Sequence, residues 1–297
     1  MTAGRFRHFI GVDWSGAAGE RHRGIAVAQA DAAGGPPTLL EPQRRWSRAE
    51  VLAYLRDDLP PDSLVGLDLG IGLPFADCDA FFPGLPPADS PPDARNLWRM
   101  VAEICEADPY FGATTFVDDP RFRSYFRRHG AREGAAFRCD GADHGMGRFR
   151  VTERRQAEMG CRPTSNFNLV GASQVGKSSL TGMRVLHELA GHIPVWPVDE
   201  IGPRGSVIVE IYTAIAALAG GRSPGRSKVK TAAELDSVLV ALGSPCCGLT
   251  GPIDDHSADA VMVAAWLRTC SSEAALWAPA DMTDGIARTE GWTFGVP

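Results

Sequence analysis

Two predicted β-strands that each end in an aspartate constrain the fold of this chain most. The short apolar run 9–12 is followed by Asp13, and the run 63–68 ends in Asp68. Short apolar runs bounded by glycine turns are typical of buried strands. Such a strand carries the carboxylate at its end to the edge of a sheet, so we expect two acidic side chains at sheet edges.

The segments between these two aspartates predict how the strands connect. Residues 23–30 and 38–46 read as two further strands, which with the first would form an antiparallel meander. Ser47 is a candidate helix N-cap, and Glu50 stands three residues later as its capping-box partner. We therefore expect three strands, a helix and a fourth strand, in an α/β fold with a mixed sheet and flanking helices.

The rest of the chain continues the α/β pattern after an interruption. We expect a single domain over 1–297, with an inserted segment, rich in arginine and mostly helix and loop, at about 76–165. Beyond the insertion, the strongest strand signal is 206–212, and 286–296 reads as a closing strand or hairpin. Helices are expected at 94–107, 175–189, 232–242 and 254–270, and from the strand at 206–212 through Ala219.

Composition and charge limit the classes of function. The net charge of -6 gives no general attraction to nucleic acid or to a membrane surface. The most apolar run, 207–219, is interrupted by Glu210 and is too short to span a bilayer, so no membrane partner is expected. Seven cysteines without zinc-ligand spacing are typical of reduced thiols, which favours a cytoplasmic protein.

The insertion concentrates positive charge in an otherwise acidic protein. Between Arg121 and Arg155 the chain holds ten arginines, interleaved with aromatic residues such as Phe122 and Phe126. Arginines can contact a phosphate backbone and aromatic rings can stack on bases, so a nucleic-acid surface is one interpretation. The other is a solvated insertion whose aromatic residues pack locally. The candidate nucleic-acid contacts are Arg121, Arg123, Arg127, Arg128, Arg148, Arg150, Arg154 and Arg155.

The predicted helix near the C-terminus begins with acidic residues. His256 and Asp259 are three residues apart, and Asp255 and Asp259 are four apart; either spacing places both side chains on one face of a helix. Capping of the helix explains Asp254 and Asp255 well, but it does not explain Asp259, which lies one turn further in. Carboxylate oxygens suit Mg²⁺ or Mn²⁺. We therefore expect a metal site that combines Asp13, Asp68 and Asp259, with Asp255 as a further candidate ligand.

Several segments resemble one known family. The segment 255–259 is similar to the last active-site motif of Holliday-junction resolvases in the ribonuclease H-like superfamily. More of the chain resembles a family of predicted ribonuclease H-like nucleases. The matching segments, in order, are 11–17, 66–74, 167–171, 175–176, 209–212, 255–259 and 290–292. Thr213 departs from the proline that many relatives carry at that position.

This resemblance implies a ribonuclease H-like fold and hydrolysis of phosphodiester bonds with two Mg²⁺ or Mn²⁺ ions. In that chemistry the ions lie about 4 Å apart, activate a water and stabilise the leaving oxygen. Asp13 would bridge the metals, and Asp68 and Asp259 would each hold one. His256 would be a ligand or a proton carrier. Glu210, within an otherwise apolar strand, is a further catalytic candidate. The substrate would be DNA or RNA, and the oligomeric state stays open, a homodimer included.

A second pattern indicates a different function. Residues 171–178 match the phosphate-loop pattern of nucleotide-binding proteins, although the apolar run before them is short. Alternatives to the nuclease are therefore a nucleotide-phosphate enzyme, as a phosphate-loop NTPase or an actin-like kinase relative, and a catalytically silent binding protein. A further interpretation combines the two functions: the N-terminus of the helix predicted at 175–189 binds a phosphate group of the nuclease substrate. The candidate phosphate-binding residues are Ser15, Gly16, Gly176, Lys177 and Ser178.

Overall fold

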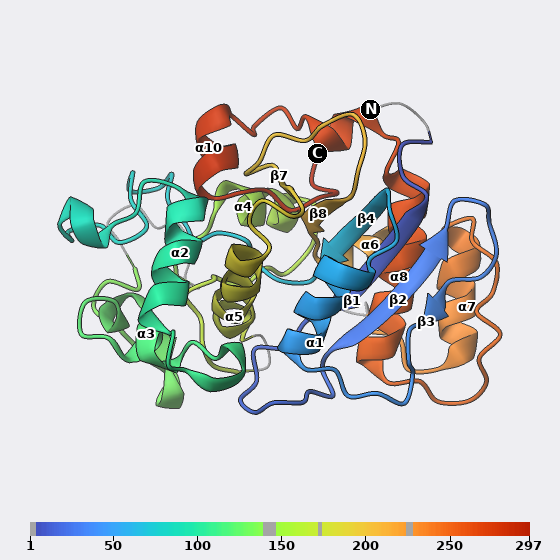
Figure 1. The fold of residues 1–297 in the computed structure, drawn as a ribbon, viewed down its shortest axis with the longest axis horizontal. Helices are drawn as coiled ribbons and strands as arrows, with labels where there is room; N and C mark the ends of the chain where they lie inside the picture. Colours follow the sequence, from blue (N-terminus) through green and yellow to red (C-terminus); the bar gives the residue numbers. More distant parts are fainter. Residues whose placement is uncertain (1–3, 139–146, 172–173, 224–227) are drawn as a thin grey trace.

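A mixed six-stranded sheet forms the centre of the computed structural model, which describes residues 4–138, 147–171, 174–223 and 228–297. The strand order is β3-β2-β1-β4-β8-β7, and helices cover the sheet (Figure 1). The expected α/β class with a mixed sheet and flanking helices is confirmed. The strands of this sheet are β1 (His8–Asp13), β2 (Ala26–Asp31), β3 (Thr38–Leu39), β4 (Ser63–Leu67), β7 (Val195–Trp196) and β8 (Val207–Glu210).

Strand pairing follows the predicted order. β1, β2 and β3 form an antiparallel meander, and β4 lies parallel to β1 on its other side. β8 and β7 then extend the sheet in parallel. Because β1 and β4 run side by side in the same direction, the residues that follow them leave the sheet at the same edge.

The helices connect these strands. α1 begins with the predicted capping box of Ser47 and Glu50. It continues into a π-helical turn, Tyr54–Asp58. The helices are α1 (Arg48–Ala53), α2 (Ala94–Ile104), α3 (Thr114–Asp118), α4 (Val151–Glu158), α5 (Val175–Glu188), α6 (Thr213–Ala219), α7 (Ala232–Ala241), α8 (Asp255–Cys270), α9 (Ala274–Trp277) and α10 (Asp284–Thr289).

Hydrophobic cores lie on both faces of the sheet. Val12 and Leu67 face the core shared with α1, α2 and α5, whereas Phe9 and Leu64 face the core shared with α6, α7 and α8. α2 and α5 pack beside each other on the side of the molecule opposite to α7 (Figure 1). α8 lies directly against β1, and a side chain at Gly11 would come within 2.3 Å of the Ala260 carbonyl oxygen. This close contact fixes where α8 starts relative to the end of β1.

Residues 76–165 hold α2, α3, α4 and a small hairpin of β5 (Arg127–Arg128) and β6 (Arg132–Glu133). Five of the aromatic residues in the arginine-rich part are buried, and Phe122 and Phe126 contact Phe82 and Phe167 in tilted or edge-on geometry. The interpretation of local packing is therefore confirmed for the aromatic residues, and base stacking by them is wrong. The residues concerned are Phe122, Tyr125, Phe126, Phe137 and Phe149.

Two predicted strands differ from the structure. The strand expected at 38–46 pairs only over Thr38–Leu39, because Glu41 takes a positive φ of 48° and Pro42 has no N–H to donate. The segment 286–296 is not a strand or hairpin. Its first part lies in α10, whose N-cap Thr283 accepts a hydrogen bond from the Ile286 N–H, and its second part makes only an isolated bridge at Thr293.

None of the helices in the described part of the chain is long and apolar enough to cross a lipid bilayer.

Candidate active site

The ends of β1 and β4 bring two carboxylates together. Val12 pairs with Leu67, and the Asp68 N–H donates to the Val12 carbonyl at 3.0 Å. The next side chains are Asp13 and Asp68, and the charge of Asp13 raises the pKa of Asp68. Asp13 is buried and Asp68 is partly buried. The predicted meeting of these two aspartates at one sheet edge is therefore observed.

α8 contributes a third carboxylate and an imidazole. Asp254 caps this helix by accepting a hydrogen bond from the Ser257 N–H, so Asp255 is its first residue. His256 Nδ1 lies 2.5 Å from Asp13 Oδ2. Asp259, one turn further along, is only 2% exposed. The carboxylate cluster, by which we mean Asp13, Asp68 and Asp259, thus combines residues from three distant parts of the sequence.

Lys228 also belongs to this site, and the motif analysis did not identify it. Its Nζ lies 2.8 Å from Asp259 Oδ2 and 3.4 Å from Asp255 Oδ2. It stands just before α7, in a segment without a recognisable motif. The only feature of the sequence that could have drawn attention to Lys228 is the small number of lysines, which are three, at positions 177, 228 and 230.

The electrostatics of the cluster show an excess of negative charge. Burial, together with the charges of Asp13 and Asp259, raises the pKa of Asp68 well above its ordinary value. Burial raises the pKa of Asp259 to about 6, although Lys228 opposes this shift. The hydrogen bond to Asp13 raises the pKa of His256. Shifts of this kind gather at functional sites, so the cluster is a candidate active site.

The donor atoms fit a hard divalent cation, since they are carboxylate oxygens. Within the described ranges, however, no group of three or more His, Cys, Asp and Glu side chains is arranged to hold a metal ion. The ammonium group of Lys228 interacts with Asp13, Asp68 and Asp259 instead. The chemistry of the site therefore suits Mg²⁺ or Mn²⁺, while the side-chain positions suit an ammonium ion.

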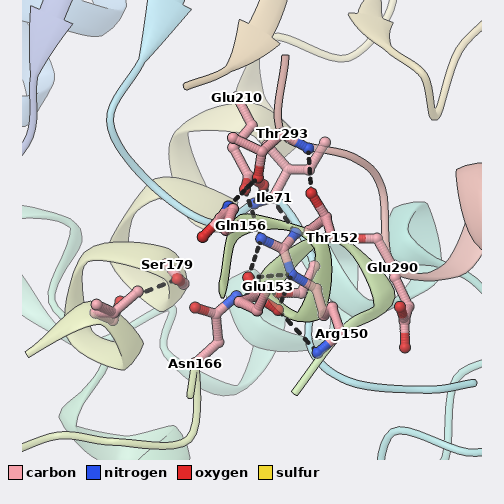
Figure 2. Close-up of polar contacts among 12 residues, drawn as sticks. Ile71, Arg150, Thr152, Glu153, Gln156, Asn166, Ser179, Glu210, Glu290 and Thr293 are labelled. Carbon is pink, nitrogen blue, oxygen red and sulfur yellow. Dashed lines mark hydrogen bonds and ion pairs between the residues drawn. The ribbon is translucent and has the colours of Figure 1, made fainter. Parts of the chain in front are cut away.

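Glu210 lies in a different network, drawn in Figure 2. Its carboxylate oxygens accept hydrogen bonds from Arg150, from the Thr293 hydroxyl at 2.5 Å and from the Ile71 N–H at 2.7 Å. Arg150 also binds Glu153, and all of these side chains are buried. This arrangement explains an acid in an apolar strand, and the assignment of Glu210 as a catalytic group stays a prediction.

A hollow of about 440 Å³ adjoins the carboxylate cluster. Asp68 and Lys228 line one part of it, and the loop 15–17 and the first turn of α5 line another. The loop packs tightly on α5, since a side chain at Gly16 would come within 2.4 Å of the Ser178 nitrogen. The predicted phosphate-binding residues Ser15, Gly16 and Ser178 therefore lie close to the carboxylates.

Arg48 holds this loop in place. Its guanidinium donates to the carbonyl oxygens of Ser15 and Ala17, and also to that of Tyr110. The side chain is 2% exposed, and burial lowers its pKa to about 10. A buried positive charge therefore lies beside the loop 15–17.

The phosphate-loop pattern lacks the strand that normally precedes it. Residues 172 and 173 lie outside the described residues, and before them Asn168 makes only an isolated bridge to Arg127. Gly176 and Lys177 lie in the first turn of α5, where a side chain at position 176 would meet the Asn166 carbonyl oxygen at 2.4 Å. Tight helix packing therefore accounts for this glycine.

The candidate nucleic-acid arginines do not form one surface. Arg148 and Arg150 are at most 1% exposed, so their assignment as nucleic-acid contacts is wrong. Arg148 is paired with Asp77 and with backbone carbonyls, because a buried guanidinium needs these acceptors. Arg121, Arg128 and Arg155 form ion pairs with nearby carboxylates, Arg127 and Arg154 are partly buried, and Arg123 is exposed.

Comparison with known proteins does not add to these observations. No protein-family model, no curated protein and no solved structure matches the chain. The candidate active site is thus defined by its own geometry and electrostatics.

Proposed function

We propose that this protein is a metal-dependent nuclease that hydrolyses phosphodiester bonds on a ribonuclease H-like fold. One observation carries the proposal: Asp13 at the end of β1, Asp68 just after β4 and Asp259 in α8 come together in the fold, with His256 of α8 2.5 Å from Asp13 and Lys228 2.8 Å from Asp259. The cluster lies where the parallel strands β1 and β4 end, and β1 to β4 follow the strand order expected for that fold. Carboxylates gathered in this way repel one another unless a cation joins them.

The residues of the chain have separate roles in this proposal. Asp13, Asp68 and Asp259 would hold the cations, with Asp255 beside them. When bound, two Mg²⁺ or Mn²⁺ ions would supply an activated water and neutralise charge on the phosphate. The hydrogen bond between His256 and Asp13 raises the pKa of His256, which favours the protonated ring, so His256 would act as a proton donor.

The hollow next to the cluster supports a phosphate-containing substrate. It is bordered by the loop 15–17 and by the N-terminus of α5, a helix of 14 residues. Helix N-termini favour anions, and the buried charge of Arg48 lies beside the same loop. Carboxylates that can hold cations, next to a helix N-terminus and a buried guanidinium, suit a phosphodiester bound to those cations.

Cleavage assays on matched variants test the proposal. Purified protein with Mg²⁺ or Mn²⁺ should cleave at least one of single-stranded, double-stranded or branched DNA, or RNA. Asp13→Asn, Asp68→Asn and Asp259→Asn should each abolish cleavage with the fold retained, as circular dichroism would verify. Asp57→Asn makes the same chemical change at an exposed position and should leave the rate unchanged. Absence of cleavage by the unmodified protein on every substrate contradicts the proposal.

A nucleotide-phosphate enzyme is the second candidate, favoured by the start of α5 at the edge of the hollow. In that case ATP or GTP should bind with a measurable heat in calorimetry, and Lys177→Ala should remove the signal. If nucleotides give no heat while nucleic acid is cleaved, the nuclease proposal stands. Binding of nucleic acid without cleavage would favour a catalytically silent binding protein.

A further inference from the structure

Lys228 is placed at the carboxylate cluster by a fixed backbone. Its carbonyl oxygen accepts a hydrogen bond from Arg222 at 2.8 Å, and the side chain of Val229 is fully buried. Lys230 accepts a backbone hydrogen bond from Ile253 at 3.1 Å, just before α8. These contacts hold the chain at the start of α8, so the Lys228 side chain reaches the acidic residues of that helix.

The ammonium group contacts carboxylate oxygens, the kind of ligand atom that Mg²⁺ and Mn²⁺ prefer. Its Nζ lies 2.8 Å from Asp259 Oδ2 and interacts electrostatically with Asp13 and Asp68. Lysine is a compact point charge, as a metal ion is, and offers donors without a fixed plane. Lys228 therefore supplies positive charge at the carboxylate cluster.

The lysine can leave this position without unfolding the protein. Its side chain is 54% exposed and lines the hollow beside the cluster. In contrast, the Asp259 side chain is only 3% exposed and stays within the helix packing. Because the aliphatic part of the Lys228 side chain is flexible and borders an open hollow, the ammonium group can move away from the cluster while the carboxylates keep their positions.

We propose that Lys228 is the resident cation of the carboxylate cluster, and that a divalent cation must displace it to bind there. The proposal rests on the proposed function for the identity of the incoming ion. Lys228 is then a further residue of the active site, and it lowers the affinity for metal by occupying the ligands. Removal of its charge should strengthen metal binding rather than weaken it.

Calorimetry with Mn²⁺ alone tests the exchange. Lys228→Met should raise the Mn²⁺ affinity about tenfold or more, the factor that corresponds to one hydrogen bond to a charged group. Lys228→Arg keeps the charge and should stay close to the unmodified protein. Lys230→Met makes the same change two residues away, at an exposed side chain, and should have no effect. Asp13→Asn should remove the binding, which would locate it at the cluster.

The reactivity of the lysines gives a second readout that needs no catalysis. Reductive methylation followed by mass spectrometry reports on three lysines, so Lys177 and Lys230 serve as internal controls. Saturating Mg²⁺ should increase the methylation rate of Lys228 relative to the controls, because the displaced amine loses its carboxylate partners.

The outcomes separate this inference from the nuclease proposal. If Mn²⁺ binds at the carboxylate cluster but Lys228→Met leaves the Mn²⁺ affinity unchanged, the proposal that the cation displaces Lys228 is wrong. The nuclease proposal is unaffected by that result. If Mn²⁺ binds neither protein, both are wrong. Tighter binding to Lys228→Met together with no cleavage of any nucleic acid would support the exchange and contradict the nuclease.

Discussion

Replacing Asp259 with asparagine should stabilise the metal-free protein. The carboxyl group is 2% exposed, and it lies among other acids at the start of α8. Asparagine has nearly the same size and carries no charge. The substitution therefore removes a buried negative charge without opening a cavity, at the cost of the ion pair with Lys228.

The structure gives the magnitude and the sign of this effect. Burial raises the pKa of Asp259 from its ordinary 3.8 to about 6. A difference of about 2 units corresponds to about 3 kcal/mol, at about 1.4 kcal/mol per unit. The folded state holds this proton more tightly than the unfolded state. The stability that the neutral carboxyl provides is therefore lost as the pH rises from about 4 through about 6.

Urea unfolding in EDTA measures the effect. Asp259→Asn should increase the free energy of unfolding by about 2–3 kcal/mol at pH 8, and the gain should shrink toward zero at pH 4. Asp57→Asn, at an exposed position, provides the matched control and should show no comparable gain at pH 8. If Asp259→Asn destabilises the protein at pH 8, the pair with Lys228 outweighs burial and repulsion, and the reasoning is refuted.

Three further predictions concern the surroundings of the site. Arg150→Met removes the ion-pair partner of two buried glutamates, Glu153 and Glu210. The free energy of unfolding, measured by urea titration, should therefore fall by about 3–5 kcal/mol. The pKa of His256, measured by NMR, should lie above its ordinary 6.5, and it should fall in Asp13→Asn. The stability that the His256–Asp13 hydrogen bond contributes should be fully present below pH 6.5. It should be lost as the pH rises through the raised pKa of His256. Gly11→Ala should destabilise by about 1–3 kcal/mol, because the added carbon would meet the Ala260 carbonyl oxygen at 2.3 Å, and an unchanged melting temperature would contradict the packing of α8 on β1.

Features that depend on neighbouring residues could be predicted from the sequence. Asp13 and Asp68 follow apolar runs, and the paired strands β1 and β4 lie where those runs were found. The capping box of Ser47 and the helical spacing of His256 and Asp259 are also observed. These signals are local, because the alternation of a strand and the turn of a helix repeat within a few residues.

Features that depend on distant contacts could not be predicted in this way. The arginines of the insertion look alike in the sequence, yet Arg148 is buried on Asp77 and Arg123 is exposed. Glu210 has its partner Arg150 sixty residues earlier. Charge and residue type do not tell whether a side chain is buried, since burial depends on which segments pack against it.

The carboxylate cluster combines both kinds of information. The strand and helix patterns were enough to predict that Asp13 and Asp68 end strands and that Asp259 shares one face of a helix with His256. The position of Lys228, 2.8 Å from Asp259, became visible in the folded protein. Its position depends on how the chain before α7 is held against α8, and a contact between segments about thirty residues apart leaves no periodic pattern in the sequence.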